Sequence, residues 1–505
     1  MGCLLLFFLL TFPLVGQAEQ KGQVVYANIY SIFYNKGGDP ITHVAGQGPM
    51  LSTTVFEGLV DYGENLQLLP SVAKSWKIAP DWSYIDLDIK EGIKFHNGDS
   101  LTAEDVKFSL DMVMNKKYRH VLANDYIKQI KNVQVLSPYK VRVNLNKPAP
   151  DLWKRFWWSG PIMPKKYREK VGDEEFAKHP IGSGPFKWVD YKQDRYFEVE
   201  ALKEHHRKTP EIKSLKVVYV PEHATRLAML QAGEADIAEL IGPQIPVVKN
   251  DPKLRYFEVK YVYGNTLNFL DLAFPNEPSP FKDIRVRKAV SLAIDRQTIC
   301  KKVFFEGNEP WGEVLNPYNH GYDPSVKPDP YDPEKAKALL AEAGYPKGFT
   351  TTFNTTPQEK FMVEPIQANL AEVGIKVDIK IFEGGSWYDA HVGKKLKGIQ
   401  IRNSWYDAEP HPGADIQNGF SSDYVWVYVN LPDVDKMIKD SMYATTDKEA
   451  AVWGRKLSKL IRESYKRPPL WEHNASYGLS QKILEWGPQK GSYPGTRFEY
   501  MKVKD

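Results

Sequence analysis

The sequence predicts an α/β protein built from more than one domain. Segments with helical periodicity alternate with segments of strand periodicity along the chain, which favours mixed α/β layers over an all-α or all-β fold. The chain has 505 residues, whereas one hydrophobic core usually serves about 250 to 300 residues, so two or three domains are expected. We find no internal repeat, low-complexity tract or flexible linker. The chain is therefore expected to cross between its domains more than once.

Two segments in the first half carry helix-end signals. In LTAEDVKFSLDMVM, Thr102 and Asp105 have the spacing of a capping box, which predicts a helix start. PEHATRLAMLQAGEADI predicts a second helix that ends at Gly233 and is followed by a strand. Its buried face is expected to consist of Ala224, Leu227 and Ala228.

The second half gives stronger patterns. In YDPEKAKALLAEAGYPKG, Asp332 caps a helix, Pro333 takes its first position, and Gly344 ends it. GIKVDIKIF alternates apolar and polar residues as a half-buried strand does. The buried stripe of the capped helix is expected to be Ala336, Leu339, Leu340 and Ala343. FKDIRVRKAVSLAIDR predicts an amphipathic helix with the buried residues Val286, Ala289, Val290, Ala293 and Ile294.

The composition does not favour a nucleic-acid partner. The net charge is only +4, from 67 basic and 63 acidic residues, and basic residues do not form blocks or aromatic-basic stripes. The chain has 13 Trp and 28 Tyr. Aromatic residues beyond the needs of a core often line ligand surfaces, although most of them stack inside it.

The N-terminus predicts a signal peptide at residues 1–18. An apolar run from Leu4 to Leu10 is followed by the small residues Gly16 and Ala18 at the spacing of an export cleavage site, although the usual basic residues before the run are missing. The run is too short to cross a bilayer, which takes about 20 apolar residues. We therefore expect an exported protein that is cut after Ala18.

The two cysteines do not suggest a disulfide or a catalytic thiol. Cys3 leaves with the predicted leader and lacks the context of a lipid-anchored cysteine. Cys300 then stands alone, so stability must come from a buried core. Cys300 lies in an apolar helical pattern, where a small buried residue is the usual case.

A search for catalytic motifs leaves one weak candidate. The chain contains no G-x-S-x-G, H-E-x-x-H or C-x-x-C sequence. SVAK, from Ser71 to Lys74, matches the S-x-x-K of penicillin-recognising acyl enzymes, but SPYK matches it too and the K-T-G partner motif is absent. An exported serine acyl enzyme using Ser71 and Lys74 remains the alternative from a different functional class.

Two other segments admit a structural and a functional interpretation. HPIGSGPF, residues 179–186, resembles a glycine-rich phosphate loop, but no helix start or lysine follows it, so a tight backbone crossing is expected. His205 and His206 in KEHHRKTP could ligate a metal, but without further ligands nearby in sequence we expect a solvated polar turn. No metal site and no cofactor are predicted.

SWYDAEPHPG, residues 404–413, is the one cluster of acids and a histidine beside aromatic residues. Its prolines and glycine keep it out of regular structure. Acids and a histidine can transfer protons, while aromatic residues beside acids can hold a cationic solute. Because no nucleophile or metal set accompanies the cluster, binding is preferred over catalysis. The residues concerned are Trp405, Tyr406, Asp407, Glu409 and His411.

Six ordered segments resemble the family 5 extracellular solute-binding proteins of bacterial ABC importers, which include dipeptide, oligopeptide and nickel receptors. The resemblance runs from about residue 24 to the C-terminus. The segments are FEGLVDYGENLQLLPSVAKSW, DLDIKEGIKFHNGDSLTAEDVKFSL, HPIGSGPF, RLAMLQAGEADI, FKDIRVRKAVSLAIDR and YDPEKAKALLAEAGYPKG.

The resemblance implies a two-lobed, three-domain periplasmic-binding-protein-like fold (type II, cluster C-like) with mixed sheets flanked by helices. Such a receptor is a periplasmic monomer that closes around one solute and delivers it to the permease subunits in the inner membrane. The expected division after the leader is domain I at 19–54, 182–270 and 476–505, domain II at 55–181, and domain III at 271–475.

The resemblance also suggests which residues bind the solute. Trp405 matches a tryptophan of peptide-binding members, but Ala408 stands where they carry the aspartate that holds the peptide amino group. Asp407 and Glu409 flank that position, so one of them is expected to hold the positive end of the solute. TTFNTTPQEKF lacks the arginine that dipeptide receptors tend to place there, whereas Arg402 matches an arginine of some oligopeptide receptors and remains a possible anion partner.

These two departures leave the solute open. A peptide or peptide-like compound is the first choice. An opine-like, glycan or other amphiphilic solute held by Trp387, Trp405 and Tyr406 is the second, and a nickel complex using His411 is the third.

Overall fold

The computed structural model describes most of the chain. The described residues are 20–28, 37–42, 48–63, 67–118, 120, 123–150, 152–158, 160–305, 308–382, 385–403, 411–422, 427–428, 432–486 and 497–504. The predicted leader, residues 1–18, lies outside them.

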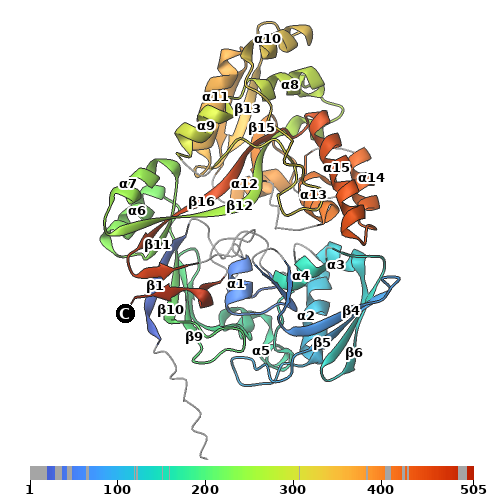
Figure 1. The fold of residues 1–505 in the computed structure, drawn as a ribbon, viewed down its shortest axis with the longest axis vertical. Coiled ribbons are helices and arrows are strands. Elements are labelled where there is room, and N and C mark those ends of the chain that lie inside the picture. Colours follow the sequence, from blue (N-terminus) through green and yellow to red (C-terminus); the bar gives the residue numbers. More distant parts are fainter. Residues whose placement is uncertain are drawn as a thin grey trace, which may run out of the picture.

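The protein has two lobes that share one large mixed sheet (Figure 1). Ten strands form this sheet, and its middle strands run between the lobes. The predicted two-lobed α/β fold is confirmed. In spatial order the strands are β14 (Lys376–Ile381), β13 (Thr350–Thr355), β15 (Ile399–Asn403), β12 (Leu254–Phe269), β16 (Pro469–Ser480), β11 (Ile237–Leu240), β1 (Lys21–Asn28), β10 (Ile212–Tyr219), β9 (Tyr196–Ala201) and β8 (Phe186–Lys192).

The antiparallel strands β12 and β16 connect the lobes because each contributes to both cores. On β12, Val259 belongs to the core of the lower lobe in Figure 1 and Leu267 to the core of the upper lobe. On β16, Trp471 packs in the upper core and Ala475 in the lower core. Two hydrogen-bonded strands therefore pass from one core to the other.

The lower lobe builds one core from both ends of the chain. Its apolar cluster includes Val24 near the start and Val503 near the end. A second sheet contains β4 (Ala73–Ile78), β5 (Tyr84–Ile89), β7 (Lys140–Leu145) and β6 (Ile130–Ser137). Two small pairs are β2 (Val60–Tyr62) with β3 (Leu68–Pro70) and β17 (Ile483–Glu485) with β18 (Lys502–Val503). The helices are α1 (Gly48–Thr54), α2 (Ala103–Met114), α3 (Ala123–Gln129), α4 (Leu152–Trp158), α5 (Lys165–Lys178), α6 (His223–Ala232) and α7 (Ile245–Asn250).

The upper lobe surrounds β12 to β15 with the later helices (Figure 1). These are α8 (Ile284–Leu292), α9 (Arg296–Val303), α10 (Pro333–Glu342), α11 (Lys360–Glu372), α12 (Gly385–Val392), α13 (Pro412–Phe420), α14 (Pro432–Ser441) and α15 (Asp447–Ser464). Short 3₁₀ turns occur at η1 (Lys116–Tyr118), η2 (Gly242–Gln244), η3 (Leu270–Ala273), η4 (Pro280–Lys282) and η5 (Phe498–Tyr500).

The predicted helix ends are confirmed where capping signals were present. The backbone N–H of Thr102 donates to the Asp105 carboxylate at 2.9 Å, the capping-box bond that opens α2. Asp332 accepts from the N–H of Lys335 at 2.9 Å, which caps α10. Gly344 has φ of +92°, a conformation that glycine adopts without strain and that ends α10. All five residues predicted for the buried face of FKDIRVRKAVSLAIDR are buried.

The predicted buried face of α6 is only partly right. Leu227 is half-buried and packs against an apolar cluster, but Ala224 and Ala228 are exposed, and the buried residues are Arg226 and Leu230. The Arg226 guanidinium donates to the carbonyl oxygens of residues 220, 221 and 239 at 2.7 to 3.0 Å. A buried arginine that satisfies backbone carbonyls therefore decides which side of α6 faces inward, and a pattern based on apolar residues cannot detect this.

The HPIGSGPF segment is the tight backbone crossing that was expected. The N–H of Gly184 donates to the carbonyl of Val55 at 2.9 Å. A Cβ atom on Gly182 would lie 2.0 Å from that same carbonyl oxygen, and one on Gly184 would lie 2.5 Å from the carbonyl oxygen of Thr54. Side chains do not fit between the two segments, so the glycines are required by the close approach.

We expect Gly182→Ala to lower the free energy of unfolding by about 1–3 kcal/mol or more, because the added methyl group overlaps a backbone atom that cannot move away easily. Urea denaturation followed by circular dichroism measures this. Gly22→Ala is the matched control, since its Cβ would meet nothing closer than Lys482 Nζ at 3.9 Å. Equal stability of the two variants would contradict the crossing.

Candidate functional site

The structure describes three of the seven residues predicted to bind the solute. Arg402 lies on β15, Trp387 on α12, and His411 directly before α13. Trp405, Tyr406, Asp407 and Glu409 lie outside the described residues. The site can therefore be described only at Arg402, Trp387 and His411 and at the residues that contact them.

Arg402 is the centre of a charged group at the end of β15. It pairs in the sheet with Thr266 of β12, one residue before the last residue of β15. Burial raises the pKa of Glu359 to about 7, and the charge of Arg402 partly offsets this. Burial lowers the pKa of Lys394 to about 8, and Arg402 lowers it further. Two cations and one carboxyl group therefore interact electrostatically where the chain enters the predicted binding segment.

Three aromatic rings, those of Trp387, His391 and Tyr428, pack together next to Lys394. The rings of Trp387 and His391 stack with centroids 5.0 Å apart, and the His391 ring lies 4.8 Å from that of Tyr428. Lys394 Nζ donates to the carbonyl of Val427 at 2.7 Å and lies 4.3 Å from the centre of the Tyr428 ring. The Tyr428 hydroxyl donates to the carbonyl of His391 at 2.8 Å. These contacts fix the position of Trp387, which is only partly exposed.

His411 is buried and hydrogen-bonded in the upper lobe. Only 6 % of its surface is exposed, and its Nε2 atom lies 3.2 Å from the carbonyl oxygen of Ala444. That contact requires the proton on Nε2, which leaves no lone pair on this nitrogen for a metal ion. A ligand role for this nitrogen would require the contact to break.

His205 and His206 are not the solvated polar turn that the sequence suggested. Only 2 % of the His205 side chain and 28 % of the His206 side chain are exposed. Both approach the fully buried carboxylate of Glu57, and His206 Nε2 lies 2.8 Å from it. The expectation was wrong because the partner is 149 positions away in the sequence and no local pattern reveals it.

Glu57 is the centre of a buried polar network in the lower lobe. Arg207 lies 3.3 Å from Glu57 and 2.9 Å from Glu499, and the Ser183 hydroxyl donates to Glu57 at 3.0 Å. Arg497 pairs with both Glu499 and Asp61. Burial opposes the charge on Glu57, but hydrogen bonds from His205 and His206 and the charge of Arg207 hold its pKa well below the ordinary value. The network joins α1, the β9–β10 connection and the C-terminal segment.

Glu57, His205 and His206 have the spacing of a metal site, but their hydrogen bonds fit an ion-pair network better. His205 Nδ1 accepts from the backbone N–H of Arg207 at 3.2 Å, so the proton of a neutral ring lies on Nε2. That nitrogen lies 2.9 Å from the carbonyl oxygen of Ser183. His205 thus presents a proton, not a lone pair, towards Glu57, and the Arg207 cation already occupies the other side of the carboxylate.

The SVAK motif does not form a catalytic pair. Ser71 is buried, Lys74 is exposed, and Lys74 lies on strand β4 rather than on a helix. The serine faces the interior and the lysine faces solvent, so the two do not form a pair in which the lysine could activate the serine.

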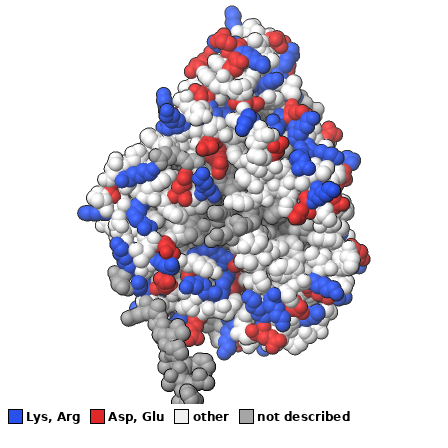
Figure 2. All heavy atoms as spheres, in the orientation of Figure 1, with Lys and Arg blue, Asp and Glu red and all other residues white. Residues whose placement is uncertain are grey.

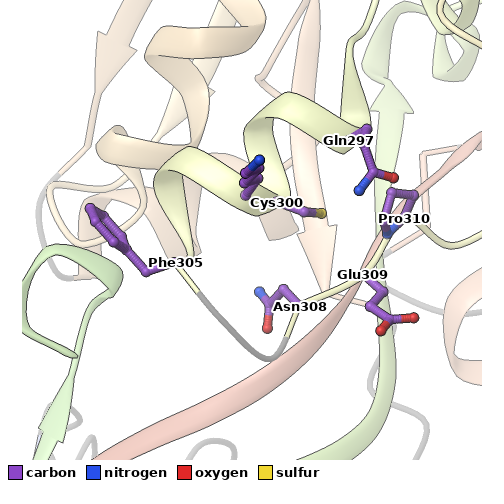
Figure 3. Close-up of a pocket in the computed structure, with 7 residues that line it drawn as sticks. Gln297, Cys300, Phe305, Asn308, Glu309 and Pro310 are labelled. Atoms are coloured by element: carbon purple, nitrogen blue, oxygen red, sulfur yellow. The ribbon is translucent and has the colours of Figure 1, made fainter. Parts of the chain in front are cut away.

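A pocket of about 420 Å³ lies beside α9 (Figure 3). Its lining residues are far along the sequence from the predicted binding segment 404–413. Burial raises the pKa of Cys300 to about 12, so this thiol stays protonated at neutral pH. Cys300 is the small buried residue expected from the sequence. The pocket is lined by Gln297, Cys300, Lys301, Phe305, Asn308, Glu309 and Pro310.

Sequence reasoning missed Glu359, Lys394 and Tyr428. Glu359 lies in TTFNTTPQEKF, which was searched only for an arginine, and Lys394 is one of three lysines in GKKLK. Tyr428 carries no local signal. Only the packing of β15 and α12 distinguishes these residues from ordinary surface residues.

The family model for bacterial extracellular solute-binding proteins, family 5 Middle, matches residues 67–425. The chain belongs to this family. Heme-binding protein A of Haemophilus influenzae is 30% identical over 384 residues, which are 69% of this chain and 68% of that protein. The resemblance inferred from the six segments is confirmed.

Solved structures agree with this assignment at the level of the fold. DppA from Helicobacter pylori, in complex with the peptide STSA, has a TM-score of 0.85 at 21% identity and covers 96% of this chain and 99% of its own. AgaA from A. tumefaciens R10, in complex with agropinic acid, has a TM-score of 0.82 at 20% identity, with 96% and 99% covered. One fold therefore holds a peptide in one protein and an opine in another.

Charges of both signs are interspersed on the face in Figure 2. In the described part of the chain, no helix has the length and apolar character needed to cross a membrane.

We expect Glu57→Gln to lower the free energy of unfolding by roughly 3 kcal/mol near pH 7, because it leaves buried cations without their counter-charge. A carboxyl group with a lowered pKa stabilises the fold above its unfolded pKa of about 4.3, and this contribution is lost as the pH falls through the folded pKa. The difference between wild type and variant should therefore shrink below about pH 4. Urea titrations at several pH values measure it.

Glu485→Gln serves as the control, since its pair with Lys502 at 2.8 Å is exposed and screened by solvent, so its loss should change the free energy of unfolding little. The metal alternative has its own test in the metal-free protein. A rise in Tm on addition of Zn²⁺ that His206→Ala abolishes would show that Glu57 and the histidines do hold a metal ion.

Proposed function

We propose that the protein is the exported receptor of an ABC importer that binds a peptide or peptide-like solute between its lobes, without catalysis. It acts as a monomer in the periplasm and delivers the solute to the permease subunits in the inner membrane. Family membership together with the two-lobed fold supports the receptor role. No resident cofactor or metal is part of this proposal.

The domain assignment expected from the resemblance is part of the proposal. On β12 the chain changes core between Val259 and Leu267, close to the proposed boundary at residues 270 and 271. On β16 it changes core between Trp471 and Ala475, close to the boundary at 475 and 476. These crossings support a domain I assembled from separate segments of the chain.

The group around Arg402 supports a solute that carries a carboxylate. Arg402 and Lys394 are two cations near the segment 404–410, and Glu359, with a pKa of about 7, is partly neutral at physiological pH. An arginine can bind a carboxylate through two parallel hydrogen bonds. We propose that this side receives the acidic end of the solute, while Asp407 or Glu409 receives its positive end.

Trp387 and Trp405 are proposed to cover the apolar part of the solute. Trp387 is held by its stack on His391, which reduces the conformational entropy lost on binding. Tyr406 and His411 complete the proposed site.

An opine or another amphiphilic solute, including a glycan, is the second candidate. It is favoured by the similar fold of a protein solved with agropinic acid and would use the same arginine and tryptophans. A nickel complex bound through His411 Nε2 would need that nitrogen to give up its contact with Ala444. The separation of Ser71 from Lys74 leaves the acyl-enzyme alternative without a catalytic pair.

Native mass spectrometry of the purified protein identifies the solute that it carries. Calorimetry on unfolded and refolded protein should then compare di- and tripeptides, agropinic acid, heme and nickel–histidine. Tightest binding of a peptide supports the proposal, and tightest binding of any other class overturns the solute assignment. Ester or amide hydrolysis that is lost in Ser71→Ala would overturn the receptor assignment itself.

Trp405→Ala should weaken binding of the native solute by about 1–3 kcal/mol, because a stacking surface is lost. This corresponds to roughly tenfold or more in Kd. One of the two acids is expected to pair with the solute amine. Its neutral variant, Asp407→Asn or Glu409→Gln, should weaken the binding free energy by more than about 1.5 kcal/mol. Trp82→Ala, in the β4–β5 turn, is the aromatic control. If Trp405→Ala, Asp407→Asn and Glu409→Gln all bind the solute like wild type, the segment 404–410 does not contribute to solute binding.

Arg402→Gln should weaken binding of a carboxylate solute by about 1.5–3 kcal/mol, as expected for a hydrogen bond to a charged group. The same substitution should leave binding of the C-terminally amidated form of that solute nearly unchanged. Isothermal titration of both forms provides the comparison. An equal loss for both forms would assign Arg402 a structural role.

A further inference from the structure

The two strands that connect the lobes contain a short stretch that belongs to neither core. On β16 it covers residues 472–474, between Trp471 in the upper core and Ala475 in the lower core. On β12 the pairing slips between Val259 and Tyr263, so that four steps along β12 match two along β16. Such a bulge increases the local twist and bends the strand. Bending between the lobes is therefore expected at this point.

The segment 308–310 of the upper lobe is attached to this stretch of β16. The N–H of Glu472 donates to the carbonyl of Glu309 at 2.9 Å, and the N–H of Asn474 donates to Asn308 Oδ1 at 2.8 Å. Pro310 forms a β-bridge with Trp471. Figure 3 shows Asn308, Glu309 and Pro310 beside the crossing strands. Bending of β16 must move this segment with it.

Three carboxyl groups and one ammonium group interact electrostatically around the bulge, with Glu472 as the group on which the other three act. Glu472 comes from β16, Glu309 from the attached segment, and Glu258 with Lys260 from β12. We call these four residues the hinge cluster. The phenols of Tyr318 and Tyr322 also interact with Glu472. The side chain of the neighbouring His473 lies outside the described residues.

The hinge cluster has more negative than positive charge when all its members are ionised. Burial raises the pKa of Glu472 to about 7, and Glu309 and Glu258 raise it further against the opposing charge of Lys260. Glu258 Oε1 is buried without a hydrogen-bond partner, and so are both polar side-chain atoms of Asn265 nearby on β12. Unpaired buried groups of this kind are costly. In this arrangement the bend therefore contains buried polar groups that have no hydrogen-bond partner among the described residues.

We propose that the hinge cluster makes the relative position of the two lobes depend on pH near neutrality, with Glu472 as the group that gains or loses the proton. Protonation removes one of three like charges at the bend and favours the arrangement seen in this structure. Deprotonation favours an arrangement in which β16 bends and Glu472 reaches water. This device is independent of the solute and of the residues proposed to bind it.

Proton binding to Glu472 and the position of the lobes are thermodynamically linked. A carboxyl group with a raised pKa binds its proton more tightly in this arrangement than in one where it is solvated, with a pKa of about 4.3. This arrangement is therefore favoured as the pH falls below about 7. Between pH 8 and pH 6 the ratio of the two arrangements should change by about tenfold.

The distance between two spin labels, one on each lobe, measures the ratio. Cysteines replacing the exposed Lys178 on α5 and Lys436 on α14 carry the labels, in a full chain with Cys3 and Cys300 changed to serine and no solute added. As the pH falls from 8 to 6, the population at the distance of the present structure should rise about tenfold relative to the other. Glu472→Gln should remove this dependence and keep the acid-like distribution at both pH values.

Two further variants separate Glu472 from other titrating groups. His473→Gln should leave the pH response unchanged, and Glu334→Gln, an exposed glutamate on α10, should do the same. The proposal is overturned if wild type shows one pH-independent distribution, if the population shifts in the opposite direction, or if the response is lost in His473→Gln but kept in Glu472→Gln. None of these outcomes depends on which solute the protein binds.

Discussion

The antiparallel pairing of β12 with β16 is the constraint on which the rest of the structure depends. Both strands are hydrogen-bonded along almost their whole length, and each contributes side chains to both cores. The lobes therefore cannot separate without breaking a sheet. Bending is expected where the pairing is irregular, between Val259 and Tyr263 and again between Asn265 and Thr266. Any conformational change on binding must be concentrated within a few residues.

Three of the polar clusters in the described part of the chain differ in where they lie relative to this pairing. The Glu57 network holds distant segments of the lower lobe together, and the group around Arg402 lies at the end of β15 in the upper lobe. The hinge cluster lies between the two lobes. In the first cluster Arg207 Nε and Glu499 Oε2 are buried without a hydrogen-bond partner among the described residues, and in the hinge cluster Glu258 Oε1 is as well.

Local patterns predicted the elements of the fold that depend on local physics. The capping residues Thr102 and Asp332 and the apolar stripe of α8 appear as expected, because caps and amphipathic faces are set by neighbours within four positions. Gly182 was also predictable, since adjacent glycines indicate a close approach. The buried face of α6 was predicted only in part, because Arg226 turns inward to satisfy backbone carbonyls of other segments.

The binding site was only partly accessible to sequence analysis, for a related reason. Arg402 could be named because it matches an arginine of some oligopeptide receptors, and Trp387 as an aromatic residue suited to an amphiphilic solute, but Glu359 and Lys394 acquire their altered proton affinities from burial in the folded chain. The pairing of His206 with Glu57 spans 149 positions. Such long-range polar contacts leave no periodicity in the sequence and become visible only once the sheet order is known.

The lower lobe takes its last core residues, including Phe498, Met501 and Val503, from the end of the chain, whereas the upper-lobe core uses residues from 267 to 471. During synthesis the lower lobe therefore cannot complete its core until almost every residue has left the ribosome. The upper lobe has its residues available earlier. A nascent chain that lacks residues 498–503 therefore leaves the part of the lower-lobe core that packs on Phe498, Met501 and Val503 exposed to water.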